Sequence, residues 1–182
     1  MSNHFGNVDN VILKDYDESY FEQFKVEKEL LLNLFGEDII SIEHVGSTAI
    51  TNIKSKPIID IAILLKSFPL TITSIEELQK INYVYWCTNP NLHHQFFFKG
   101  LPRTHHLHFY PLGYHKYEDQ IIFRNFLLNN DDKAKEYECL KIELAHLYKD
   151  DREKYSEMKA DFVESVLSGF KEKTTHNICL PK

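Results

Sequence analysis

The amino-acid sequence predicts one α+β domain, in which a mixed β-sheet comes first and a set of helices follows. Two patterns carry this prediction. The run from Ile58 to Leu65 is almost continuously apolar and rich in β-branched residues, which is typical of a strand buried on both faces. From about His115 onward, apolar residues instead recur at helical spacing. A length of 182 residues with 43% hydrophobic residues is enough for one substantial core.

The first expected element is a helix that begins near Ser19 and ends at Gly36. Ser19 and Glu22 have the spacing of a capping box, and a glycine commonly follows the last helical residue. Apolar side chains at helical spacing predict which face of this helix packs on the sheet. They are Phe21, Phe24, Leu31, Leu34 and Phe35.

Strands dominate the next part of the chain. Short apolar or alternating runs separated by turn residues predict each of them. The expected strands are Ile39 to Val45, Ile58 to Leu65, Tyr83 to Trp86, Phe96 to Lys99 and Thr104 to Tyr110. A short helix from Ile75 to Lys80, capped by Thr73 or Ser74, interrupts the series.

The last of these strands carries two histidines on one face. Because side chains alternate along a strand, His106 and His108 point the same way, together with Thr104 and Tyr110. The intervening residues, His105 among them, point the other way. A polar strand face of this kind is expected to line a cleft.

Three apolar stripes predict the C-terminal helices. The first stripe is Ile122, Phe123, Phe126 and Leu127; the second is Tyr137, Leu140, Leu144, Leu147 and Tyr148; the third is Tyr155, Met158, Phe162 and Val166. Gly169 is expected to end the third helix. We therefore expect a single domain over residues 1–170 and a polar C-terminal tail over residues 171–182.

Composition excludes several classes of function. The net charge of −6 provides no overall positive field, so no nucleic-acid partner is expected. No run reaches membrane-spanning length, so no membrane partner is expected either. Cys87, Cys139 and Cys179 have no pairing or ligand spacing, which favours a reducing cytoplasm. The sequence contains no signal for an oligomeric state.

A Gly-Ser turn followed by a buried carboxylate is the strongest functional pattern. Gly46, Ser47 and Thr48 offer a backbone that can approach a phosphate closely and two hydroxyl donors. Asp60 interrupts the most apolar strand, where an unpaired carboxylate would cost several kcal/mol. It could hold a divalent cation that bridges to a phosphate. The alternative is a turn glycine and an aspartate with only structural hydrogen bonds.

These residues identify a family resemblance. His44-Val-Gly-Ser-Thr48 followed by Lys56-Pro-Ile-Ile-Asp60-Ile resembles the GrpB family of bacterial proteins, which is placed in the nucleotidyltransferase superfamily. The likeness continues through Arg103-Thr-His-His-Leu-His108, Phe123-Arg124 and Tyr137-Glu-Cys-Leu-Lys141, and it ends near Tyr155 and Lys159. The resemblance implies a nucleotidyltransferase-like fold, in which a Gly-Ser turn precedes a strand that bears metal-binding acids. It implies no particular substrate.

One departure from the superfamily pattern concerns the metal. Active members usually carry a second acid two residues after the first, but this chain has Ala62 at that position. Further ligands would therefore come from elsewhere, and the candidates are Glu43, His44, His106 and His108. Mg²⁺ or Mn²⁺ is expected if oxygen ligands dominate. Zn²⁺ is possible if histidines ligate, because imidazole is a poor ligand for magnesium.

Basic residues within the matching motifs are candidates for phosphate binding. Lys56, Arg103 and Arg124 are the ones we single out, since arginine's planar fork suits phosphate oxygens. Each has a plain alternative. Lys56 could lie at a strand entrance with its charge in water, and Arg124 could pin the helical part to the sheet. Lys54 and Lys141 are further basic residues in these motifs, and Lys141 could lie on a solvated helix face.

Three functions remain open from the sequence. The first is a metal-dependent nucleotidyltransferase acting on a nucleoside triphosphate and a small acceptor, with Asp60 and His108 as catalytic residues. The second is a non-catalytic module of the same fold that binds a nucleotide or phosphorylated metabolite. The third is a hydrolase built on a His/Asp metal site. Nucleotide titration, the Asp60→Asn variant and elemental analysis of the purified protein distinguish them.

Overall fold

The computed structural model describes residues 10–87 and 91–176 and contains one five-stranded mixed sheet. The strands are β1 (Ile39–Val45), β2 (Ile59–Leu65), β3 (Tyr83–Tyr85), β4 (Gln95–Lys99) and β5 (His105–Pro111), in the order β1-β2-β5-β4-β3. Only the central pair, β2 and β5, is parallel; the other neighbours are antiparallel. The α+β class expected from the sequence is confirmed, and each strand lies within about one residue of its expected range.

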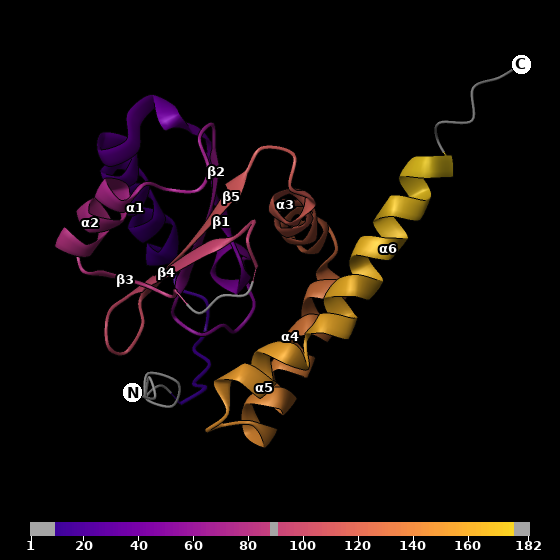
Figure 1. Cartoon of the computed structure of the whole chain (residues 1–182). Helices are drawn as coiled ribbons and strands as arrows, with labels where there is room; N and C mark the ends of the chain where they lie inside the picture. Colours follow the sequence, from indigo (N-terminus) through magenta and orange to yellow (C-terminus); the bar gives the residue numbers. More distant parts are fainter. Residues whose placement is uncertain (1–9, 88–90, 177–182) are drawn as a thin grey trace, which may run out of the picture.

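Two helices cover one face of the sheet. They are α1 (Ser19–Phe35) and α2 (Ile72–Lys80), drawn to the left of the sheet in Figure 1. The largest apolar core lies beneath them, where Phe24 and Leu31 of α1 meet Ile61 and Ile63 of β2. β2 is thus packed on both faces at its centre, which explains its nearly continuous apolar sequence.

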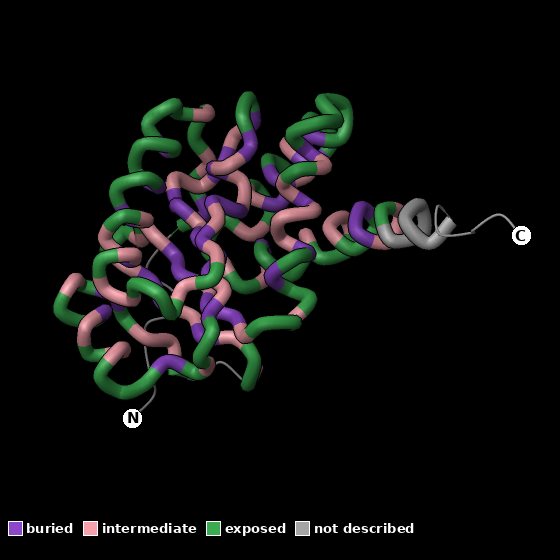
Figure 2. The backbone as a smooth tube through the Cα atoms, turned by 90° about the horizontal axis from the view of Figure 1, so that it is seen from above, coloured by how far each residue is buried: buried purple, intermediate pink, exposed green. Residues whose placement is uncertain are grey.

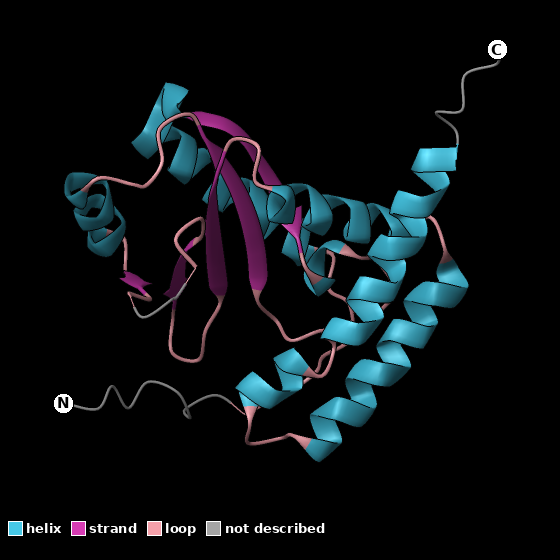
Figure 3. Ribbon diagram, turned by 45° about the vertical axis from the view of Figure 1, so that its right-hand side comes forward, coloured by secondary structure: helices cyan, strands magenta, loops and turns pink. Residues whose placement is uncertain are grey.

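Helices of the C-terminal part cover the opposite face. They are α3 (His115–Leu128), α4 (Asp131–Leu147), α5 (Arg152–Glu157) and α6 (Ala160–His176). α3 packs on β1 and β2, and α4 and α6 pack on α3 through a second apolar core that contains Phe123, Tyr137 and Leu167. Figure 3 shows α4 and α6 side by side, with α5 at their lower end. Figure 2 shows buried residues gathered along the strands and green, exposed residues on the outer helical turns.

Two expectations about helix caps and one about a core residue were wrong. The Asp17 carboxylate, rather than a Ser19 capping box, accepts the hydrogen bond from the backbone N–H of Ser19 (2.8 Å). Thr71 caps α2 by accepting from the N–H of Ser74 (3.1 Å). Phe21 also lies outside the core at 51% exposure, since Tyr20 takes the buried position beside it.

The expected third C-terminal helix is two helices. The chain breaks at Met158 and Lys159 between α5 and α6, and α6 then continues through Gly169 to His176. Residues 171–176 of the expected polar tail are therefore helical; residues 177–182 lie outside the described part. Nothing within 4 Å would meet a Cβ at Gly169, so this glycine fits a helix interior without steric consequence. Among the described residues, no helix is both long and apolar enough to span a membrane.

Candidate functional site

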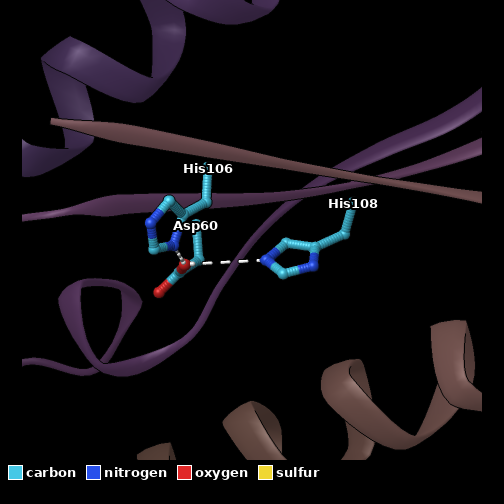
Figure 4. Close-up of side chains that lie close together, drawn as sticks. All are labelled: Asp60, His106 and His108. Atoms are coloured by element: carbon cyan, nitrogen blue, oxygen red, sulfur yellow. Dashed lines mark hydrogen bonds and ion pairs between the residues drawn. The ribbon is translucent and has the colours of Figure 1, made fainter. Parts of the chain in front are cut away.

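The register of the two central strands brings Asp60 and the two histidines together. Asp60 pairs with His106 across the parallel β2–β5 ladder, and Ala62 pairs with His108. Paired residues in a ladder share a face, so all three polar side chains point toward the helical part. In Figure 4 the Asp60 carboxylate lies between the two imidazole rings.

The histidine beside Asp60 acts as a hydrogen-bond donor. His106 Nδ1 lies 2.7 Å from Asp60 Oδ1, and its Nε2 lies 3.1 Å from an Nη atom of Arg152. A guanidinium only donates, so His106 Nε2 must accept and the proton must be on Nδ1. Burial lowers the pKa of His106 to about 4, so the ring is neutral at physiological pH. His106 therefore orients Asp60.

The second histidine belongs to a pair. His108 Nε2 lies 3.7 Å from Asp60 Oδ1, whereas its Nδ1 lies 3.0 Å from Nε2 of His94. The rings of His94 and His108 stack with centroids 5.2 Å apart. Burial, with the nearby His108, lowers the pKa of His94 to about 3, so the His94 ring is neutral at physiological pH.

Asp60 stays ionised and remains accessible. Burial would raise its pKa, but hydrogen bonds from His106 and His108 outweigh that effect and hold the pKa well below its usual value. Its side chain is 26% exposed. The carboxylate lines two cavities, so it is available to a ligand.

The backbone of Gly46 lies close to that carboxylate. A Cβ on Gly46 would lie 2.3 Å from Asp60 Oδ2, and the glycine has a φ of +69°. Both observations require glycine at this position. The cause is the register of the antiparallel β1–β2 pair, which sets Val45 opposite Asp60 and brings the following turn over the carboxylate.

The two hydroxyl residues of the turn have different surroundings. Ser47 lines the first cavity, where its role as a phosphate-binding residue stays a prediction. Thr48 is buried, and its hydroxyl donates to the backbone carbonyl of Ile58 (3.0 Å). Thr48 therefore holds the turn against the start of β2, in place of the expected phosphate contact.

Four cationic side chains line the first cavity, which has a volume of about 470 Å³. Lys56 precedes β2, Arg103 lies in the turn between β4 and β5, Arg152 begins α5, and Lys159 separates α5 from α6. We call this space the cationic cavity. The sheet and the helical part contribute two cations each, and Asp60, His106 and His108 lie in its wall.

The surroundings of the two lysines in the cationic cavity lower their pKa values, so both are partly deprotonated near neutral pH. Burial, together with Arg152 and Lys159, lowers the pKa of Lys56 to about 7. Burial also lowers the pKa of Lys159 to about 8, with Asp60 opposing the shift and Arg152 adding to it. Like charges held close together in this way favour an anion between them.

Aromatic rings support these cations. Lys56 and Lys159 both lie over the ring of Tyr155, with Nζ at 4.9 and 4.4 Å from its centroid. The guanidinium carbon of Arg103 lies 4.1 Å from the centroid of Phe98. These contacts orient the cationic groups at the cavity wall.

His44 lies on the opposite face of the sheet from Asp60. Its ring stacks on Phe24 of α1 with centroids 5.0 Å apart, and its Nε2 contacts Thr48 Oγ1 at 3.0 Å. Because the Thr48 hydroxyl proton goes to Ile58, His44 must donate from Nε2. Burial lowers the pKa of His44 to about 4. The structure therefore gives His44 a packing role in place of the expected metal ligation.

Arg124 and Glu43 form a pair of their own. Arg124 Nη1 lies 2.8 Å from Glu43 Oε2 and donates to the carbonyl of His44 at 2.7 Å. The arginine thus joins α3 to β1, which is the structural alternative considered above. Neither residue lines the two cavities beside Asp60, so the structure separates Arg124 from the phosphate-binding candidates and Glu43 from the metal ligands.

The other two lysines of the matching motifs are also structural. Lys54 pairs with Asp15. Lys141 is 1% exposed, and its ammonium donates to the carbonyl of Lys54. The possibility that Lys141 lies on a solvated helix face was wrong, because the apolar stripe of α4 leaves this lysine pointing inward beneath the turn before β2.

One group among the described residues has the composition of a metal site. Ligand atoms of Asp60, His106 and His108 all lie within 4.8 Å of one another. His106 offers its protonated nitrogen to this group while Arg152 holds its other nitrogen. In this arrangement, Asp60 and His108 are therefore the two residues of the group whose ligand atoms can approach a cation.

Sequence reasoning missed three residues that the fold brings to the site. Arg152 and Lys159 belong to the helical part, far along the chain from Asp60, and His94 precedes β4. Lys159 had one signal in the sequence, because the family resemblance ends near it. Arg152 follows Asp151, which caps α5 by accepting from the backbone N–H of Lys154 (2.9 Å).

Comparisons with known proteins identify the family and agree with the overall fold. The family model described as GrpB protein matches residues 10–168. A UPF0157 protein of Pseudomonas aeruginosa is 34% identical over 92% of this chain and 71% of its own, and the glutamate-rich protein GrpB of Alkalihalophilus pseudofirmus is 33% identical over 89% and 97%. The crystal structure of conserved protein GrpB from Enterococcus faecalis superposes with a TM-score of 0.78 at 30% identity, over 90% of this chain and 99% of that one. This chain belongs to the GrpB family.

Proposed function

We propose that this protein is a nucleotidyltransferase that transfers a nucleotidyl group from a nucleoside triphosphate to a small acceptor. The observation that supports it is the cationic cavity, where four basic side chains surround a space of about 470 Å³ beside Asp60. A triphosphate carries several negative charges and needs several cations to offset them. In this proposal Lys56, Arg103, Arg152 and Lys159 hold the phosphate chain.

A divalent cation completes the proposed site. Mg²⁺ is usually held by one or two carboxylates together with water and substrate phosphates, and Asp60 beside the cationic cavity fits that role as a single acid. When bound, the ion would polarise the phosphorus that is attacked and neutralise charge on the phosphate oxygens. Mn²⁺ would serve equally. Zn²⁺ becomes an option if the Nε2 atom of His108 also ligates.

The chain's own residues would provide positioning and charge. Gly46 leaves room for the carboxylate of Asp60, and His106 fixes its orientation. The cations remain in place before substrate arrives, since Tyr155 and Phe98 support them. Preorganised charge of this kind accounts for much of the catalysis in phosphoryl transfer.

Calorimetric titration with nucleoside triphosphates and Mg²⁺ tests the proposal. We expect a dissociation constant in the micromolar range. It should rise at least tenfold when Lys56 and Lys159 are both changed to Met. Lys135→Met is a matched control, because Lys135 lies on the exposed face of α4. A folded protein that binds no triphosphate, with or without Mg²⁺, would overturn the proposal.

A second candidate is a phosphometabolite-binding module without turnover, and Ala62 is the observation that favours it. The place of a second acid is taken by a methyl group paired with His108. This candidate predicts triphosphate binding that Asp60→Asn changes by less than about threefold and no transfer. The transferase predicts that the same variant loses the Mg²⁺-dependent part of binding.

A third candidate is a hydrolase with a transition metal held by Asp60 and His108, which the compact Asp60–His106–His108 group favours. Elemental analysis of the purified protein and of a sample incubated with Zn²⁺, Mn²⁺ or Fe²⁺ tests it. Stoichiometric metal that is lost in Asp60→Asn and His108→Ala would support it. A protein that takes up none of these ions would remove it.

A further inference from the structure

A second cavity, of about 440 Å³, opens against the same reactive residues as the cationic cavity. Asp60, His94 and His108 line both. The rest of its wall comes from the end of β1 and the turn after it, from Asn91 and Tyr110, and from α3, α4 and α6. A molecule in this second cavity and a phosphate chain in the cationic cavity would therefore meet at Asp60 and His108.

The two cavities differ in charge. The second cavity has Lys116 as the cation in its wall, and Nζ of that lysine lies 3.8 Å from the buried carboxylate of Asp119, which also lines the cavity. Its remaining surface is largely aromatic and aliphatic, including Phe123, Val163 and Leu167. A polyanion would find little compensation there, whereas an uncharged or cationic molecule with an apolar body would.

One polar atom of the second cavity needs a partner. Gln120 Nε2 donates to the Tyr110 hydroxyl at 2.7 Å, but Gln120 Oε1 is buried and has no hydrogen-bond partner within the described part of the chain. A ligand hydroxyl or amine satisfies this oxygen when the Gln120 side chain turns toward the cavity.

The imidazole pair between the cavities gives an acceptor a polar neighbour. His108 Nε2 lies 3.7 Å from Asp60 Oδ1, and its Nδ1 lies 3.0 Å from His94 Nε2. A hydroxyl placed in the second cavity near these rings would lie beside the carboxylate that borders the cationic cavity.

We propose that the second cavity is the acceptor subsite and takes a small, uncharged or cationic molecule with a hydroxyl group. The inference rests on the proposed function and adds the class of acceptor. In the reaction, the acceptor oxygen bonds to the α-phosphorus of the triphosphate, and the bond between that phosphorus and the β-phosphate oxygen breaks. The hydroxyl proton is released to solvent, and pyrophosphate leaves in the cationic cavity.

Three probes with the same aromatic body test the charge preference of the second cavity: tyrosol, tyramine and 4-hydroxyphenylacetate, which end in a hydroxyl, an ammonium and a carboxylate. Chemical-shift titration should show tyrosol and tyramine binding at least tenfold more tightly than the carboxylate. Equal or tighter binding of 4-hydroxyphenylacetate would overturn the proposal. So would no binding of any probe to a protein that still binds triphosphate.

Variants locate the probes and separate the two proposals. Two variants change the wall of the second cavity: Val163→Trp fills it, and Gln120→Leu removes the unpaired acceptor. Each should weaken tyrosol binding at least fivefold and change the affinity for MgATP by less than twofold. Val26→Trp, on the exposed face of α1, is the control. Unchanged tyrosol binding in both variants would overturn the subsite. A further outcome is a protein that binds tyrosol, loses that binding in these variants and yet has no affinity for MgATP. That result would support a binding site in the second cavity and refute the transferase proposal.

Discussion

At the scale of single residues, the site depends on how closely one turn approaches one carboxylate. Asp60 has an imidazole donor on one side and the backbone of Gly46 on the other. The sequence marked both residues, because a carboxylate in an apolar strand and a glycine before two hydroxyls are each unusual. It could not show that they touch, since the contact follows from the β1–β2 register.

Gly46→Ala tests this contact. The new methyl would overlap Asp60 Oδ2, and the positive φ adds the cost of a left-handed conformation for a residue with a Cβ. Gly113→Ala is a matched control, because Gly113 has a φ of +80° and no atom within 4 Å of the methyl group that the substitution would add. In urea denaturation we expect Gly113→Ala to cost about 1 kcal/mol and Gly46→Ala at least about 2 kcal/mol more. Equal losses would show that the carboxylate moves aside freely.

At the scale of elements, alternation gave His106 and His108 their shared face correctly, whereas the β1–β2 register was needed to place His44 on the other face. Residues on one strand were therefore predictable relative to one another. Their neighbours on other strands were not, because two strands can pair in several registers. The same limit applies to α4: its apolar stripe predicted the helix, but nothing local indicated that Lys141 points inward to cap the carbonyl of Lys54.

The buried Lys141 makes stability depend on pH. Burial lowers its pKa in the folded state to about 7, below the 10.5 of an exposed lysine. Between these values the unfolded chain binds the proton and the folded chain does not, so folded stability rises with pH. Lys141→Met removes this group from the titration. The free energy of unfolding of the natural protein, minus that of Lys141→Met, should rise by on the order of 1 kcal/mol per pH unit between pH 7.5 and 9.5. A flat or falling difference would contradict the assignment.

At the scale of the whole molecule, the cationic cavity exists because the helical end folds back against the sheet. Lys56 and Arg103 border the sheet, while Arg152 and Lys159 frame α5. No spacing in the sequence relates these two pairs, and the break between α5 and α6 lies where a continuous helix was expected. The class of fold was thus predictable from periodicity, and the Asp60 region from the motif. That four cationic side chains share one cavity could be known only from the tertiary structure.

That assembly predicts proton uptake when a triphosphate binds. The pKa values of Lys56 and Lys159 are lowered to about 7 and about 8 in the free protein, and bound phosphate oxygens would raise both. At pH 8 the two lysines are partly deprotonated, so binding should take up about one proton, and affinity should fall as pH rises from 7 to 9. Calorimetry in Tris and in HEPES at pH 8 measures the uptake, because the two buffers release protons with different enthalpies. The Lys56→Met, Lys159→Met double variant should lose the buffer dependence along with the affinity. Binding of triphosphate to the natural protein with no proton uptake would mean that these lysines do not hold the phosphates, and would move the anion site away from α5.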